Sequence, residues 1–106
     1  MNPIPFEIYE ANMQFGKVAY RRPCVVVSTL KDGRIFAMAI SSAMELCKGL
    51  PAHFTIDETD PDFPKTGLKQ TSYINLIDQY LMRPEELIRK RGQIEGELLQ
   101  RLLKRI

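Results

Sequence analysis

The sequence predicts a mainly β domain, a small barrel of roughly five to seven strands with an amphipathic helix at its C-terminus. Its first support is the β-branched run Val25–Val27, which is typical of a strand buried on both faces. The second is the pair Asp32-Gly33 between two apolar runs, which is typical of a tight hairpin. The third is a helical stripe of aliphatic side chains near the end of the chain: Leu98, Leu99, Leu102, Leu103 and Ile106.

The chain of 106 residues is expected to be one domain, spanning residues 1–106. Its hydrophobic fraction of 44% and charged fraction of 26% are ordinary for a soluble globular protein. No apolar run is long enough to span a membrane, and no basic-then-apolar leader opens the chain. We therefore expect a cytoplasmic protein with no membrane partner. Cys24 and Cys47 show no metal-binding or redox spacing, so both thiols are expected to stay reduced.

The formal net charge of +2 understates the basic character of most of the chain. Four of the 13 acidic residues lie in one loop, at 57–62, which leaves nine acidic residues against the 15 basic ones elsewhere. This balance is compatible with a polyanionic partner, although an ordinary solvated surface explains it equally well. The acidic loop lacks the spacing and the glycine of a calcium loop, so we expect no metal site there.

From the N-terminus, an imperfect alternation of polar and apolar side chains predicts a first strand over residues 7–13. Residues 14–20 include Gly16 and are expected to form a flexible connection. Pro23 biases Arg22 towards an extended backbone, which suits the entrance of the central strand.

Short elements are predicted for the middle of the chain. Residues 43–47 are expected to form a helical turn, and Pro51 to open a strand over residues 52–56. A further strand is expected over residues 70–76.

The C-terminal part is predicted to be helical or irregular and then clearly helical. One segment begins at Pro84, a residue tolerated in the first turn of a helix, and ends at Gly92. Glu95 and Glu97 open the terminal helix and basic residues end it, which complements the helix dipole. We expect its apolar stripe to be buried against the sheet.

The central hairpin brings cations and hydroxyl groups to one edge. Arg21 and Arg22 begin the first of its strands, and Ser41 and Ser42 end the second. Because the strands of a hairpin are antiparallel, these two ends meet at the same edge of the sheet. Guanidinium groups bind oxyanions through paired donors, so this edge is a candidate anion site.

The order of these features resembles the MazF/PemK (Kid) family of toxin endoribonucleases. The similarity extends over most of the chain and is carried by these segments: Glu7–Tyr9, Arg22–Ser28, Ile40–Ser42, Thr66–Leu68, Ser72–Ile74, and Gly92 with Leu98–Ile106. It implies an SH3-like barrel, a homodimer, and cleavage of single-stranded RNA without a metal or another cofactor. It also implies neutralisation by a cognate antitoxin.

Several positions depart from the family pattern. Phe6 replaces the glycine that usually precedes the opening acid, and Ser41 replaces a threonine but keeps its hydroxyl. Some members carry an arginine and an aspartate that supply acid–base groups, where this chain has Asn75 and Ile77, with Asp78 one step further on. A second interpretation therefore stays open: a catalytically degenerate SH3-like module that binds a protein or nucleic-acid partner.

RNA cleavage of this kind needs a base for the 2′-OH, an acid for the leaving 5′-oxygen and cations that stabilise the phosphorane. Arg22 is the predicted cation, because its planar charged fork suits phosphate. Ser41 and Ser42 are predicted to hydrogen-bond the scissile phosphate, with closure of the turn as the alternative. Glu7, which matches the family's opening acid, is the predicted general base, and an ion pair with Arg21 or Arg22 is the alternative.

Five further residues are predicted to contact RNA. Lys17, Arg21 and Lys69 are expected to attract its phosphates. Asn75 and Asp78 lie at or beside the family's acid–base positions, so they are placed in the same group.

Roles are also predicted for three aromatic side chains, for the single histidine and for one basic run. Phe15 and Tyr20 are candidates for stacking on bases, whereas core packing is expected of Tyr9. His53 is expected to face solvent from its strand, and the basic run Arg89–Arg91 to form a solvated edge.

Overall fold

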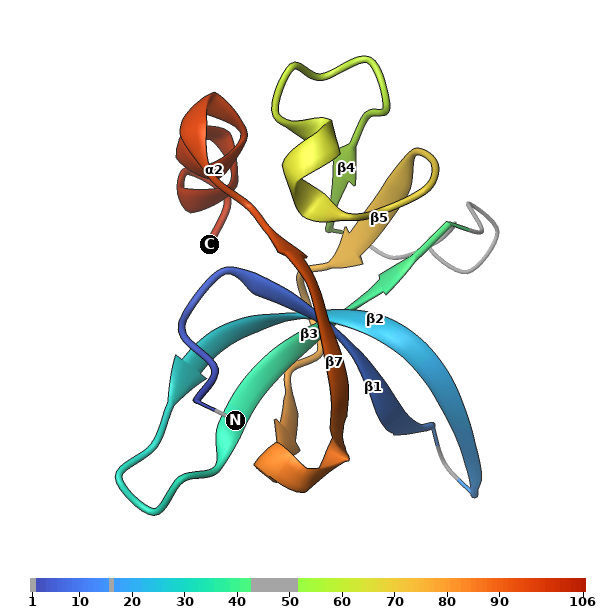
Figure 1. The fold of residues 1–106 in the computed structure, drawn as a ribbon, viewed down its shortest axis with the longest axis vertical. Coiled ribbons are helices and arrows are strands. Elements are labelled where there is room, and N and C mark those ends of the chain that lie inside the picture. The colour runs from blue at the N-terminus through green and yellow to red at the C-terminus, as the bar shows by residue number, and fades with distance from the viewer. Residues whose placement is uncertain (1, 16, 43–51) are drawn as a thin grey trace.

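Within the described residues, seven strands form one curved antiparallel sheet and one α-helix follows at the C-terminal end (Figure 1). The computed structural model describes residues 2–15, 17–42 and 52–106. The strands are β1 (Glu7–Phe15), β2 (Val18–Thr29), β3 (Ile35–Ser41), β4 (His53–Ile56), β5 (Ser72–Asn75), β6 (Tyr80–Met82) and β7 (Leu87–Gln93). The helical elements are the 3-10 turns η1 (Phe63–Thr66) and η2 (Pro84–Glu86) and the α-helix α2 (Gly96–Leu103). The predicted mainly β class with a C-terminal helix is confirmed.

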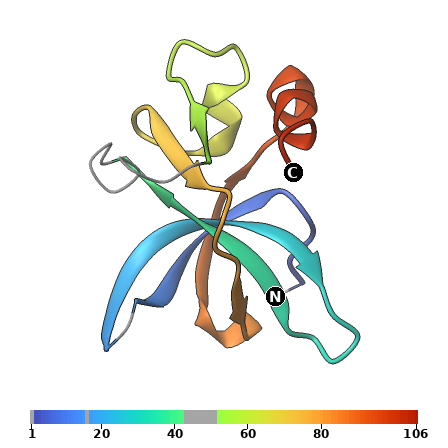
Figure 2. The same cartoon turned by 180° about the vertical axis from the view of Figure 1, so that it is seen from behind.

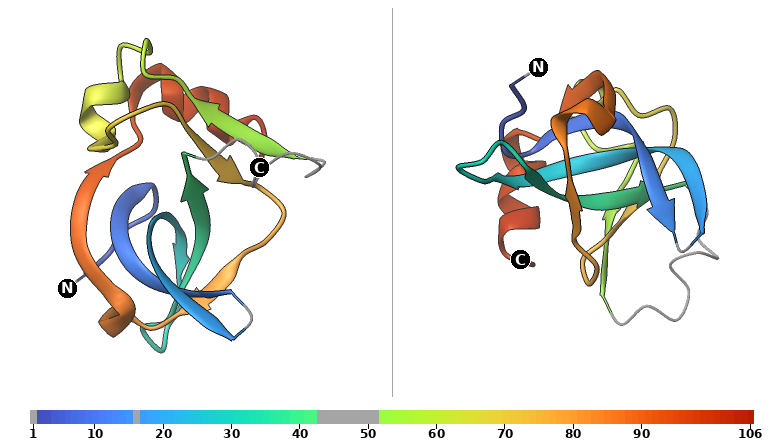
Figure 3. Two further views of the ribbon diagram at one scale, coloured as in Figure 1. Left: turned by 90° about the vertical axis from the view of Figure 1, so that its right-hand side faces the viewer. Right: turned by 90° about the horizontal axis from the view of Figure 1, so that it is seen from below.

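The sheet runs in the order β4-β5-β3-β2-β1-β7, and β6 pairs with the part of β3 that precedes the β5 pairing. Across the described residues the end strands β4 and β7 do not pair, so the predicted barrel is curved but open (Figure 3). η1 packs against β7 at this end of the sheet. A Cβ on Gly92 of β7 would stand only 2.2 Å from the carbonyl oxygen of Lys65 in η1.

The central hairpin forms as predicted. β2 and β3 are antiparallel, with Cys24 opposite Ala39. The Asp32 carboxylate accepts a hydrogen bond from the Arg34 backbone N–H at 3.0 Å. Gly33 has a φ of +92°, in the left-handed region that favours glycine. The resulting tight turn projects from the sheet (Figure 2) and reverses the chain.

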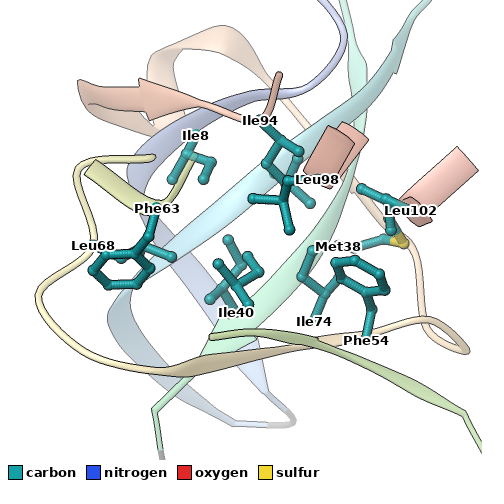
Figure 4. Close-up of a cluster of buried hydrophobic side chains, with 12 residues drawn as sticks. Ile8, Met38, Ile40, Phe54, Phe63, Leu68, Ile74, Ile94, Leu98 and Leu102 are labelled. Atoms are coloured by element: carbon teal, nitrogen blue, oxygen red, sulfur yellow. The ribbon is translucent and has the colours of Figure 1, made fainter. Parts of the chain in front are cut away.

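Apolar side chains cover both faces of the sheet. The first cluster is drawn in Figure 4: Ile8, Val25, Met38, Ile40, Phe54, Ile56, Phe63, Leu68, Ile74, Ile94, Leu98 and Leu102. The second cluster lies on the other face: Tyr9, Ala11, Met13, Cys24, Val26, Ile35, Ala37, Ala39, Met82 and Leu87. Val25 and Val26 are both fully buried, one in each cluster, so β2 is buried on both faces as its sequence predicts.

Helix α2 buries less of its apolar stripe than expected. Leu98 and Leu102 are fully buried, and Leu99 packs at the margin of the same cluster. Leu103 is 43% exposed and Ile106 is 50% exposed, so burial of the whole stripe is wrong. The reason is length: the helix has only eight residues and ends at Leu103, before the stripe does.

Two predictions about connections are wrong. Most of the expected flexible connection over residues 14–20 is strand, because β1 extends to Phe15 and β2 begins at Val18. The segment from Pro84 to Gly92 is helical only in η2, and from Leu87 onwards it pairs with β1 as strand β7. The basic run inside β7 hides the alternation that identifies a strand.

Some predictions fall outside the described residues: the helical turn at 43–47, the strand entrance at Pro51, and Cys47. Cys24 is a buried free thiol, and burial raises its pKa to about 12. No helix in the described parts of the chain is long and apolar enough to cross a membrane.

Candidate functional site

A pocket of about 380 Å³ opens where the hairpin ends meet the segment that leads into β5. Its described walls come from four parts of the chain: Tyr20, Arg21, Arg22 and Pro23 of β2; Ile40 and Ser41 of β3, with Ser42; Leu68, Lys69, Gln70 and Ser72; and Arg91 of β7. We call it the hairpin pocket. It gathers several predicted site residues: Arg22, Ser41, Ser42, Arg21 and Lys69.

The hairpin pocket is positively charged. Its described lining holds four cationic side chains and no carboxylate. Serine hydroxyls lie in the same lining, although the Ser72 hydroxyl donates to the Gln70 carbonyl at 2.9 Å. Outside the lining, Glu10 lies 3.8 Å from the guanidinium of Arg21. Cations and hydroxyls suit a bound anion, because both donate hydrogen bonds to oxyanions.

Arg22 and Ser41 line the hairpin pocket from two strand ends that separate. The pairing of β2 with β3 stops at Cys24 opposite Ala39, and beyond it Ser41 pairs with Tyr73 of β5. The Arg22 guanidinium lies over the Tyr20 ring, with its central carbon 5.2 Å from the ring centroid. Alternate residues of a strand point to the same side, so this stacking follows from the spacing of Tyr20 and Arg22. It holds the charged fork at the wall of the pocket.

Arg91 is a pocket residue that the sequence analysis placed on a solvated edge. Its Nη2 donates to the Gly67 carbonyl at 2.9 Å, and its side chain lines the pocket. The two basic residues before it are engaged elsewhere, Arg89 with Glu10 and Lys90 with Glu7. A solvated edge is therefore wrong for Arg91. The available clue was the pair of glycines, Gly67 and Gly92, that lets two backbones touch beside it.

A family model described as PemK-like, MazF-like toxin of type II toxin-antitoxin system matches residues 5–106. The chain belongs to this family. A search of curated proteins finds no match. The match includes every described residue that lines the hairpin pocket.

Glu7 of this PemK-like chain does not line the hairpin pocket. Its carboxylate is buried and bound on both oxygens. Oε1 accepts from the Ile4 N–H at 2.8 Å and from the Tyr9 hydroxyl at 3.0 Å, and Oε2 lies 2.7 Å from the Lys90 ammonium. The alternative ion pair with Arg21 or Arg22 is also not formed by Glu7.

The surroundings of Glu7 lower its pKa. Burial alone would raise the pKa of the carboxyl, but hydrogen bonds from Lys90, Ile4 and Tyr9 together outweigh it. A carboxylate with a lowered pKa is a weaker base, so these contacts fit a structural role better than the predicted general base.

We expect Glu7→Gln to remove part of the pH dependence of stability. The folded-state pKa of Glu7 lies below its ordinary value of 4.5, so the ionised group stabilises the fold above that pH. This contribution is lost as the pH falls through the folded-state pKa. Urea unfolding from neutral to acidic pH measures it: the deficit of the variant should be largest near neutrality and shrink in acid. A deficit that stays constant with pH would contradict the assignment.

The remaining predicted RNA contacts of the PemK-like chain lie outside the pocket lining. Asn75 and Asp78 close the turn after β5: Asn75 Oδ1 accepts from the N–H groups of Ile77 and Asp78, at 2.9 and 3.3 Å. Lys17 is exposed in the turn between β1 and β2.

His53, which was not a predicted RNA contact, packs its ring edge-on to Tyr73, with centroids 5.8 Å apart.

Proposed function

We propose that this PemK-like chain is a cytoplasmic endoribonuclease toxin that cleaves single-stranded RNA in the hairpin pocket. The observation that carries the proposal is the pocket lining: four cations and several hydroxyls, with no carboxylate among the described residues. Single-stranded RNA supplies both a phosphate for such a site and the 2′-OH that attacks it.

The chemistry needs no group beyond RNA, water and the pocket. The 2′-oxygen attacks the adjacent phosphorus, its proton passes to water, and the 5′-oxygen leaves with a proton from solvent. In the phosphorane between these steps negative charge builds on the non-bridging oxygens, and Arg22 stabilises it through charge-assisted hydrogen bonds. Ser41 donates a further hydrogen bond at the same edge. Arg21 and Lys69 attract the strand to the site.

The partners of the proposed toxin follow from the family. We assign the chain a cognate protein antitoxin, as a type II toxin–antitoxin system requires. An acidic antitoxin segment suits the hairpin pocket, because its carboxylates would be attracted by the four cationic side chains of the described lining. We also assign a homodimer, which the family resemblance supports.

Incubation of the purified protein with labelled single-stranded RNA in EDTA tests the proposal. We expect fragments with a 5′-hydroxyl and a 2′,3′-cyclic phosphate, because the 2′-oxygen is the nucleophile. The control is the DNA oligonucleotide of the same sequence, which lacks that oxygen and should stay intact. Intact RNA, or cleavage of the DNA as well, would overturn the proposed reaction.

A further inference from the structure

We propose that Arg91 binds a second phosphate of the substrate, on a nucleotide neighbouring the one held at Arg22. The inference rests on the proposed function and deepens it: the pocket takes a strand of RNA by two phosphates. It makes Arg91 a substrate-binding residue, on the far strand of the sheet from the hairpin.

Arg91 differs from its two basic neighbours in β7, because no carboxylate among the described residues forms a salt bridge with it. Arg89 lies 2.8 Å from Glu10, and Lys90 lies 2.7 Å from Glu7, so both neighbours in β7 are neutralised by carboxylates. Among the described residues Arg91 forms no salt bridge, and its one hydrogen bond goes to the uncharged Gly67 carbonyl. A guanidinium has five N–H donors, so most of the fork is left for an anion in the pocket.

Arg91 lies too far from Arg22 for one phosphate to bridge their backbones. In the sheet order β2-β1-β7, one strand separates Arg22 from Arg91. Two strand spacings put their backbones about 10 Å apart. They are also offset along the strands, because Arg22 lies opposite Ala11 whereas the neighbours of Arg91, Lys90 and Gly92, lie opposite Tyr9 and Ile8.

The guanidinium groups of Arg22 and Arg91 are each held at a different wall of the hairpin pocket. Arg22 stacks on Tyr20, and Arg91 is bonded to the Gly67 carbonyl beside the segment that carries Lys69. A single phosphodiester carries one negative charge, and the pocket presents four cations, one of which, Arg21, forms a salt bridge with Glu10. Two phosphates of one strand, each at its own arginine, match this separation and charge better than one phosphate does.

The backbone around Arg91 is packed tightly against the segment of η1 and Gly67. A Cβ on Gly67 would stand 2.0 Å from the Arg91 carbonyl oxygen, and a Cβ on Gly92 would stand 2.6 Å or less from atoms of Thr66 and Lys65. The backbone on both sides of Arg91 is therefore in direct contact with the segment that precedes Lys69. Because its backbone is held by these contacts and its guanidinium by the Gly67 carbonyl, Arg91 loses little conformational entropy when a phosphate binds.

The test compares Arg91→Ala with Arg34→Ala, the loss of an arginine that lies outside the pocket and pairs with Asp32 at the hairpin turn. The probes are 2′-O-methyl RNAs of mixed sequence, which cannot be cut: a labelled octanucleotide with several phosphates, and a dinucleotide with one. We expect Arg91→Ala to weaken octanucleotide binding about tenfold or more. The slope of log affinity against log salt should fall by about 0.7, while Arg34→Ala should leave affinity unchanged.

The dinucleotide, measured as a competitor of the octanucleotide, distinguishes the phosphate site at Arg22 from the one at Arg91. Arg91→Ala should leave its affinity unchanged, and Arg22→Ala should abolish it. The inference is overturned if Arg91→Ala binds the octanucleotide as Arg34→Ala does, or if it weakens both probes equally. Should Arg91→Ala not fold, Arg91→Lys decides by the same comparison, because lysine keeps the charge but lacks the planar fork.

Failure of the proposed function gives a different result. Wild-type protein that binds these probes but never cuts RNA would remove the nuclease and keep the two-phosphate site. Wild-type protein that binds neither probe would remove both.

Discussion

Arg22→Ala should lower the rate of RNA cleavage about 100- to 1,000-fold, the usual effect of losing one group that stabilises a developing oxyanion. The side chain is stacked on Tyr20 and lines the hairpin pocket together with Ser41, which ends β3. Its fork therefore reaches the non-bridging oxygens of a phosphate bound between the two strand ends. Arg22→Lys should recover little activity, because an ammonium cannot form two parallel hydrogen bonds or stack in the same way.

Arg34→Ala is the matched control for this prediction. Arg34 belongs to the same hairpin but lies at its turn, where it pairs with Asp32 at 2.7 Å and is exposed. The comparison uses single-turnover cleavage of one RNA by wild type and the variants, with unfolding curves to show that each is folded. Equal rates for wild type and a folded Arg22→Ala protein would contradict the assigned role.

Gly67→Ala should destabilise the fold by about 3 kcal/mol or more, the sum of two penalties. Gly67 has a φ of +71°, where a Cβ is strained, and the added Cβ would stand 2.0 Å from the Arg91 carbonyl oxygen. That oxygen belongs to the backbone of β7, so relief requires η1 and β7 to separate.

Gly33→Ala measures the cost of a positive φ without the cost of a steric clash. Gly33 has a φ of +92°, but nothing lies within 4 Å of an added Cβ. We expect a loss of about 1 kcal/mol from the backbone conformation alone. Urea unfolding of both variants measures the difference, which is the contribution of the contact between η1 and β7. Equal losses for the two variants would show that this contact is not tight.

The parts of the fold that short-range patterns specify could be predicted. The Asp32-Gly33 turn and the run Val25–Val27 carry their own local chemistry, and both behave as expected. Strand β7 could not be predicted in this way, because its charged run Arg89–Arg91 has no alternation of apolar and polar residues. Its strand conformation depends on pairing with β1, about eighty residues away in sequence.

The candidate site also depends partly on local sequence patterns and partly on long-range pairing. Arg22 and Ser41 line one pocket because they lie at the same end of the β2–β3 hairpin, which antiparallel pairing makes predictable. Arg91 enters the pocket only because η1 touches β7, which no local pattern indicates. Glu7 was expected to act as a base, but Lys90 neutralises it across the β1–β7 pairing. Long-range pairing therefore decides which charged residues are free for a ligand.

The location of bound RNA tests the central claim most directly. An amide NMR titration of the labelled protein with an uncleavable 2′-O-methyl RNA reports it residue by residue. We expect shifts concentrated in the four parts of the chain that form the hairpin pocket: residues 20–22, 40–42, 68–72 and 91. Shifts confined to the exposed turn at Lys17 or to the turn at 75–78, with the pocket amides unchanged, would contradict the account.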